Sequence, residues 1–175
     1  MNLGEQLCLA CGMCCDGTLF DNVRFGPDES TDDLKALGMP VKRSRAKVPV
    51  AFFKQPCRAL CGDLKCKVYQ DRPQQCRSFE CGVFKELAAG ETSLESALRV
   101  VKKARRKADQ ARRLLRKMGE EDERSSLGLR LRRVQRQIDS GMIDASAAEA
   151  FADLGLVMHQ LDLLAHERFY TEEEE

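Results

Sequence analysis

Residues 8–15 read CLACGMCC, a dense run of thiols near the start of a chain of 175 residues. Its cysteines are Cys8, Cys11, Cys14 and Cys15. Thiolates separated by two residues on a tight turn can hold one soft metal ion, or the iron of a cluster, without a large fold behind them. Gly12 permits such a turn and would bring Cys11 and Cys14 together. This stretch predicts a fold that is organised around bound metal.

A second group of cysteines lies further along the chain. Residues 66–81 read CKVYQDRPQQCRSFEC, and Cys57 precedes them. A ninth cysteine, Cys61, stands four residues after Cys57, so on a helical turn it would share the same face and could replace a ligand. All nine cysteines precede residue 82, which confines the expected metal chemistry to the first half of the chain.

Clustered cysteines serve either disulfides or metal, and the rest of the sequence favours metal. A secreted disulfide scaffold usually has an even cysteine count and a signal peptide, whereas residues 1–6 have no basic start and no apolar run. We therefore expect a cytoplasmic protein whose thiols stay reduced. No apolar stretch approaches the roughly 20 residues of a membrane-spanning helix, so no membrane partner is expected.

The two cysteine motifs resemble those of a known family. Cys-x-x-Cys-Gly-x-Cys-Cys, followed by Cys-x-x-Tyr-x-x-Arg-Pro-x-x-Cys-Arg-x-Phe, is similar to the CxxCxxCC proteins, the YkgJ-type cysteine-cluster family described as zinc- or iron-chelating. The resemblance covers residues 8–81 and leaves the second half outside. It implies eight metal ligands, which are Cys8, Cys11, Cys14, Cys15, Cys57, Cys66, Cys76 and Cys81. Cys61 falls where the family pattern often has an apolar residue, which makes it the extra cysteine.

The number of thiolates limits what they can hold. Four thiolates make one tetrahedral zinc site or hold one iron–sulfur cluster, so eight could fill two sites. Adjacent side chains usually point apart, so Cys14 and Cys15 would serve different metals, unless one of them bridges two. The spacing matches neither a ferredoxin loop nor a zinc ribbon and leaves both metals open. The resemblance favours iron or an iron–sulfur cluster, with zinc as the alternative.

Other residue types support binding more than catalysis. Arg72 and Arg77 would place cations beside the thiolates and offset the negative charge of a metal–thiolate site. The two histidines, His159 and His166, are seven residues apart on one expected helix, about 10 Å, which is too far to hold one ion together. A catalytic thiol would also lack a nearby histidine base. We expect a metal-binding protein with no evident catalysis, and whether it is an enzyme stays open.

The predicted fold class is mainly α. Residues 1–85 carry all nine cysteines and all five prolines and should form an irregular metal-binding module. Residues 86–170 should form a helical bundle or hairpin of about three helices, and residues 171–175 a disordered acidic tail. Within the first module, residues 48–53 could form a short strand or an apolar lid, and residues 28–39 a short helix.

Apolar spacing predicts the three helices of the second half. The first has a seam that repeats every 3.5 residues, with Thr92 or Ser93 as its cap and Gly119 at its end. The seam consists of Ala97, Val101, Ala104, Ala108, Ala111, Leu115 and Met118. The second helix should cover residues 127–138 and the third residues 144–168. One face of the third carries Ala147, Phe151, Leu154, Met158, Leu161 and Ala165.

Charge is distributed unevenly along the second half. Residues 91–136 hold 15 Lys or Arg against 7 acids, a net +8, whereas residues 137–175 hold 1 Arg against 10 acids, a net −9. The two segments should pack together or face partners of opposite charge. The basic run at 102–107 leaves open a zinc-stabilised protein that binds nucleic acid, although no aromatic residue interleaves with it.

Two further alternatives concern partners of the cluster. A similar cysteine cluster occurs in flagellin lysine N-methylases, so an iron–sulfur redox accessory to a modifying enzyme remains open. The alanine-rich seam of the first helix also leaves open a protein partner or a homodimer through the helical region.

Overall fold

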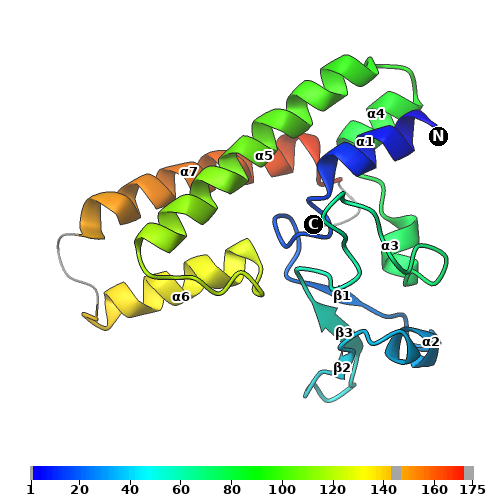
Figure 1. Cartoon of the computed structure of the whole chain (residues 1–175), viewed down its shortest axis with the longest axis horizontal. Helices are drawn as coiled ribbons and strands as arrows, with labels where there is room; N and C mark the ends of the chain where they lie inside the picture. Colours follow the sequence, from blue (N-terminus) through cyan, green and yellow to red (C-terminus); the bar gives the residue numbers. More distant parts are fainter. Residues whose placement is uncertain (1, 143–146, 172–175) are drawn as a thin grey trace.

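The structure, a computed structural model, describes residues 2–142 and 147–171 (Figure 1). Its helices are α1 (Leu3–Cys11), α2 (Asp32–Ala36), α3 (Gln74–Ser78), α4 (Gly82–Ala88), α5 (Leu94–Lys117), α6 (Leu127–Asp139) and α7 (Ala148–Arg168). Its strands are β1 (Asn22–Arg24), β2 (Lys42–Arg43) and β3 (Ala51–Lys54). The fold is mainly α, as the sequence predicts, with a cysteine-rich first half and long helices in the second.

The first helix, α1, carries two of the cysteines and was not predicted from the sequence. A capping box begins it, because the Asn2 side chain accepts a hydrogen bond from the Glu5 N–H at 2.8 Å and the Glu5 carboxylate accepts one from the Asn2 N–H at 3.0 Å. Gly12 ends it with φ +64°, and the Cys15 N–H then donates to the Gly12 carbonyl at 3.0 Å. The tight turn predicted at Gly12 is confirmed, but a regular helix precedes it.

A small antiparallel sheet follows, with strand order β1-β3-β2. Strand β3 confirms the strand reading of residues 48–53, shifted toward its end because Val48 is exposed. Helix α2 lies inside the predicted helical range 28–39. The sheet and α2 enclose a small hydrophobic core, formed by Val23, Phe25, Leu34, Met39, Phe53, Ala59 and Val68.

The three predicted helices of the second half are confirmed as α5, α6 and α7. The Ser93 side chain caps α5 by accepting from the Ser96 N–H at 3.2 Å, and Gly119 follows its end with φ +82°. Its buried residues are those of the predicted seam, Ala97, Val101, Ala104, Ala108, Ala111 and Leu115. Residues 144–146, predicted to begin the third helix, lie outside the described residues, as do residues 172–175 of the predicted tail.

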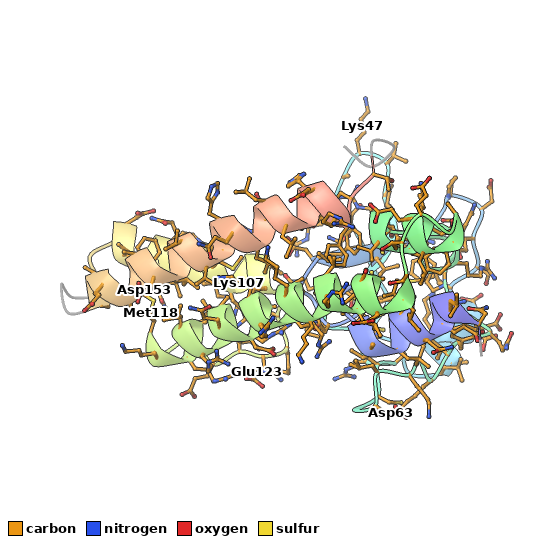
Figure 2. The ribbon with its side chains drawn as sticks, turned by 90° about the horizontal axis from the view of Figure 1, so that it is seen from above. Lys47, Asp63, Lys107, Met118, Glu123 and Asp153 are labelled. Carbon is orange, nitrogen blue, oxygen red and sulfur yellow. The ribbon has the colours of Figure 1, made fainter. Side chains whose placement is uncertain are left out.

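Helix α5 is the centre of the larger core. Helices α1, α4, α6 and α7 all pack against it, and the small alanine side chains of the seam let α7 approach closely along most of its length. Figure 2 shows α5 and α7 side by side with Lys107 between them, where its ammonium group lies 2.6 Å from the Gln160 side-chain oxygen. The basic and acidic segments therefore do pack together, chiefly through apolar residues.

The segment that follows α7 is hydrogen-bonded to the start of α4 and to the loop before β1. The Gly82 N–H donates to the Phe169 carbonyl at 3.1 Å, and the Tyr170 hydroxyl donates to the Leu19 carbonyl at 2.7 Å. A Cβ at Gly82 would lie 2.8 Å from the Arg168 carbonyl oxygen, closer than such contacts occur, so this approach requires glycine. As a result the larger core combines residues from both sides of residue 85.

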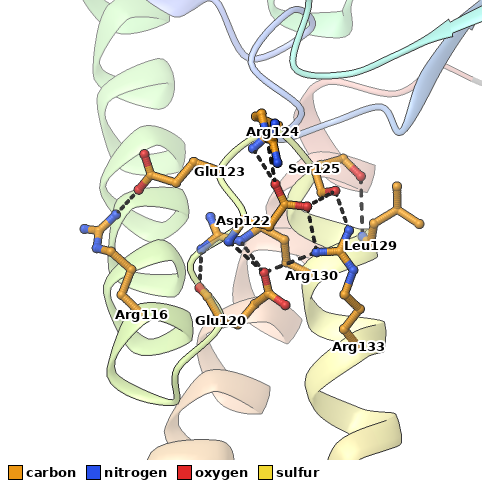
Figure 3. A network of polar contacts seen from close by, with 10 residues as sticks. Arg116, Glu120, Asp122, Glu123, Arg124, Ser125, Leu129, Arg130 and Arg133 are labelled. Carbon is orange, nitrogen blue, oxygen red and sulfur yellow. Dashed lines mark hydrogen bonds and ion pairs between the residues drawn. The ribbon is translucent and has the colours of Figure 1, made fainter.

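A polar network fixes the connection between α5 and α6 (Figure 3). Arg130 is 2 % exposed and donates to the Glu120 backbone carbonyl at 2.6 Å, while the Glu120 carboxylate also pairs with Arg133 at 3.2 Å. Arg133 pairs with Asp122 at 3.0 Å as well. Buried charges persist only when they are compensated in this way, so the network holds α6 in a defined orientation. Among the described residues no helix is long and apolar enough to cross a membrane.

Candidate metal centre

All eight predicted ligands line one cavity of about 580 Å³. They are Cys8, Cys11, Cys14, Cys15, Cys57, Cys66, Cys76 and Cys81. Cys61 is not among the described residues that line it. The cavity lies between the cysteine-rich half and the helices, because Val101 of α5 and Phe169 after α7 also contribute to its wall. The fold thus gathers cysteines from two distant stretches of sequence around one space.

The first half of the wall comes from α1 and the turn after it. Cys8 and Cys11 are one turn apart in α1, so their side chains are neighbours on one helix face. Cys14 lies in the turn that Gly12 begins. Cys81 is the residue immediately before α4, and α4 packs against α1. Helix packing therefore brings Cys81 to thiols that precede it by more than sixty residues.

The second half of the wall comes from the chain around the sheet. Cys57 follows β3, and its N–H donates to the Cys15 carbonyl at 2.8 Å. Cys66 pairs with Leu60 in an isolated antiparallel bridge, which folds the loop back toward Cys57. Cys76 lies in the short helix α3, which packs against β1.

Burial changes the acidity of these thiols. It raises the pKa of Cys11, Cys15 and Cys76 to about 12 and that of Cys81 to about 11, and it raises the pKa of Cys14 well above its usual range. Neighbouring thiols add to this effect, because bringing several thiolates together is electrostatically unfavourable. Without a cation these five thiols stay protonated at neutral pH, and a bound metal ion would displace those protons.

Arg72 confirms the prediction of a cation beside the thiols. Its charge opposes the effect of burial on the pKa of both Cys8 and Cys76. The guanidinium group stacks over the Tyr69 ring at 3.7 Å from the centroid, and its Nε donates to the Tyr69 carbonyl at 2.9 Å. Arg77 also lines the cavity. A metal–thiolate centre here would meet positive charge that is already held in place.

Helix α5 holds the cysteine turn, which was not predicted from the sequence. Arg112 pairs with the Asp16 carboxylate at 3.2 Å and donates to the Thr18 hydroxyl at 2.8 Å. Arg105 lies 3.9 Å from the same carboxylate and also donates to the Cys11 carbonyl. Two of the basic residues of α5, Arg105 and Arg112, thus contact the turn and do not face solvent alone. The acid immediately after Cys15 was the one signal in the sequence for this contact.

Gln55 is a second residue that sequence reasoning missed. It is 1 % exposed and lines the cavity, and its side-chain N–H donates to the Cys14 carbonyl at 3.0 Å. Its side-chain oxygen is buried and has no hydrogen-bond partner in the part of the chain that the structure describes. An unpaired buried oxygen is costly, so its position in the cavity wall is consistent with a site that a bound group completes.

The thiols line the cavity but do not converge on a common position where a metal ion could sit. Within residues 2–142 and 147–171, no three Cys, His, Asp or Glu side chains are grouped closely enough to hold an ion as they stand. The donor set still fits zinc or iron, because both favour thiolates and eight are present around one space. His159 and His166 are not among the described residues that line the cavity.

The fold and the cavity together define a small, mainly helical protein in which eight cysteines line one cavity. A family model described as "CxxCxxCC: Putative zinc- or iron-chelating domain" matches residues 7–108, and the chain belongs to this family. The match extends beyond residue 81, where the motifs alone placed its end, and it includes α4 and the first part of α5. No curated protein and no solved structure matches the chain.

Proposed function

We propose that this protein chelates iron, as ions or as an iron–sulfur cluster, or zinc, through the thiolates of eight cysteines. These ligands are Cys8, Cys11, Cys14, Cys15, Cys57, Cys66, Cys76 and Cys81. One observation carries the proposal: these eight line one cavity, and the ninth cysteine does not. Metal binding would draw the thiolates inward, displace their protons and join the two halves of the cavity wall.

The residues around the ligands have supporting roles. Arg72 would offset the negative charge of the metal-bound centre. The Gln55 side-chain N–H would hold the Cys14 carbonyl, and the Gln55 side-chain oxygen would gain a hydrogen-bond partner in the completed site. Arg105 and Arg112 would keep the cysteine turn against α5. Loss of such a supporting contact commonly lowers metal affinity by about 10- to 100-fold.

Analysis of metal and acid-labile sulfide tests the proposal directly. Protein purified without air should contain iron or zinc in a fixed ratio to the chain. Brown protein with iron and sulfide would identify an iron–sulfur protein and favour a redox role beside a modifying enzyme. Colourless protein with zinc would identify a chelating or structural site. Folded protein without any metal would contradict the proposal.

Cysteine variants test which thiols are ligands. Cys76→Ser should lose metal, because Cys76 lines the cavity, whereas the matched control Cys61→Ser should keep the full content. Metal content of the two purified variants is measured under the same conditions. If Cys61→Ser alone empties the protein, the assignment of the eight ligands is wrong.

A second candidate function, binding of nucleic acid, is favoured by the outer face of α5. Five exposed cations project from the side opposite the alanine seam, and the described residues provide no ion-pair partner for them. They are Lys102, Lys103, Arg106, Arg113 and Lys117. A stripe of this kind would contact phosphates and not bases.

Salt dependence tests this second candidate. Binding of a short duplex, followed by fluorescence anisotropy, should weaken steeply as salt rises, because cations on the duplex are released on binding. Replacing Arg106 and Arg113 by Glu should abolish binding without changing metal content. Binding whose affinity changes neither with salt nor in the variant would contradict this second proposal.

A further inference from the structure

The cavity wall divides between two adjacent residues, Cys14 and Cys15. Each has its backbone carbonyl fixed by a different donor: the Gln55 side-chain N–H donates to that of Cys14 at 3.0 Å, and the Cys57 backbone N–H donates to that of Cys15 at 2.8 Å. Consecutive side chains in an extended or turning chain project in different directions, so the two thiols are held toward different surroundings.

Four of the cysteines belong to the helical side. Cys11, Cys14 and Cys81 all pack against the larger core, which α5 organises. Cys8 is one helical turn from Cys11. Cys81 immediately precedes α4, and α4 packs against α1, the helix that carries Cys8 and Cys11.

The other four belong to the sheet side. Cys57, Cys66 and Cys76 pack against the smaller core of β1, β3 and α2. Cys15 is tied to Cys57, because the Cys57 N–H donates to the Cys15 carbonyl.

Resting on the proposed function, we propose that the eight thiolates form two separate four-thiolate centres and not one shared centre. The first comprises Cys8, Cys11, Cys14 and Cys81, and the second Cys15, Cys57, Cys66 and Cys76. Four thiolates complete the coordination of one tetrahedral ion or one cluster, so neither centre needs a bridging sulfur. The peptide bond between Cys14 and Cys15 links the two centres covalently.

Arg72 is placed to serve both centres. It lines the cavity that both groups of cysteines share. Two centres with four thiolates each would both carry net negative charge and repel one another, and a guanidinium group in the same cavity reduces that repulsion. The stack on Tyr69 keeps Arg72 in position.

Adjacent variants give the sharpest test. Cys14→Ser and Cys15→Ser change neighbouring residues, yet each should lose one half of the metal, and the two variants should retain different centres. Adding Cys81→Ser to Cys14→Ser should cause no further loss, since both belong to the first centre. Adding Cys76→Ser to Cys14→Ser should remove all metal. Complete loss in each folded single variant would overturn the division while leaving chelation intact.

Cadmium-113 NMR tests the division without any variant. Wild-type protein loaded with cadmium-113 in the absence of air should give two resonances of four-thiolate sites, with no splitting between them. Splitting between the two signals would show a shared sulfur and overturn the proposal. A protein that takes up no metal at all would instead contradict the proposed function.

Discussion

The two hydrophobic cores of this protein differ in how many apolar residues they bury. The larger core, on the helical side, contains twenty buried residues among those described, whereas the smaller core under the sheet contains seven. Hydrophobic burial is the main favourable term in folding, so the helical side has far more of it. The first group of cysteines therefore packs against the better-supported core, and the second group against a core that buries much less apolar surface.

Removing the metal should destabilise the sheet region much more than the helical region, and this is the largest effect that we expect. Structural metal sites contribute about 10 kcal/mol or more to folding. After an added chelator has removed the metal in the absence of air, amide hydrogens of β1 and β3 should exchange rapidly, while those of α5 and α7 stay protected. Hydrogen exchange with mass spectrometry measures this. Simultaneous loss of protection in both regions would mean that the helical side also depends on metal.

Arg130→Met should weaken the helical region alone. The change leaves the buried Glu120 carboxylate with one fewer partner, and we expect a loss of about 3 kcal/mol in the free energy of unfolding. Urea denaturation measures it, and the loss should be the same with and without metal. Arg124→Met is the control, because the Arg124 side chain is 95 % exposed and should matter little. Equal losses in the two variants would refute the importance of burial.

Arg112→Gln should weaken the link between the regions. It removes one of the two cations that hold Asp16, so the cysteine turn is less firmly fixed to α5. Metal affinity should fall about tenfold, measured by competition with a chelator of known affinity. Arg113→Gln alters the next residue, which is exposed, and should leave the affinity unchanged. The same affinity in both variants would show that α5 does not support the cluster.

Ser93→Ala should have the smallest effect, a slight loss of stability in the helical region alone. It removes the side-chain acceptor at the start of α5 and should cost about 1 kcal/mol in the free energy of unfolding. Thr92→Ala is the matched control at the preceding residue. Thermal denaturation distinguishes the two, and metal content should stay the same in both. A larger loss from Thr92→Ala would place the cap one residue earlier.

Local patterns predicted the helices of the second half because their apolar residues repeat within a few turns. The seam from Ala97 to Leu115 is buried as predicted, and the Ser93 cap follows from its residue type. Helix α1 was missed although its capping box, Asn2 and Glu5, is visible in the sequence. The density of cysteines there suggested irregular structure and obscured the helical signal.

The candidate site was predicted only in part. The motifs singled out eight cysteines, and the structure places those eight around one cavity, although their role as ligands stays a prediction. The support from Arg105 and Arg112 could not be foreseen, because each reaches a partner 94 residues earlier in the chain. Likewise, the grouping of Cys81 with α1 depends on how α4 packs, which no local pattern specifies.

The contact between Gly82 and Phe169 bears on the order of events during synthesis. Every cysteine leaves the ribosome long before Phe169, which closes part of the cavity wall and joins the start of α4 through its carbonyl. A nascent chain folds from its N-terminal part first. In the growing polypeptide the cysteine cavity therefore lacks the part of its wall that Phe169 later supplies, so solutes can reach it most easily before translation ends.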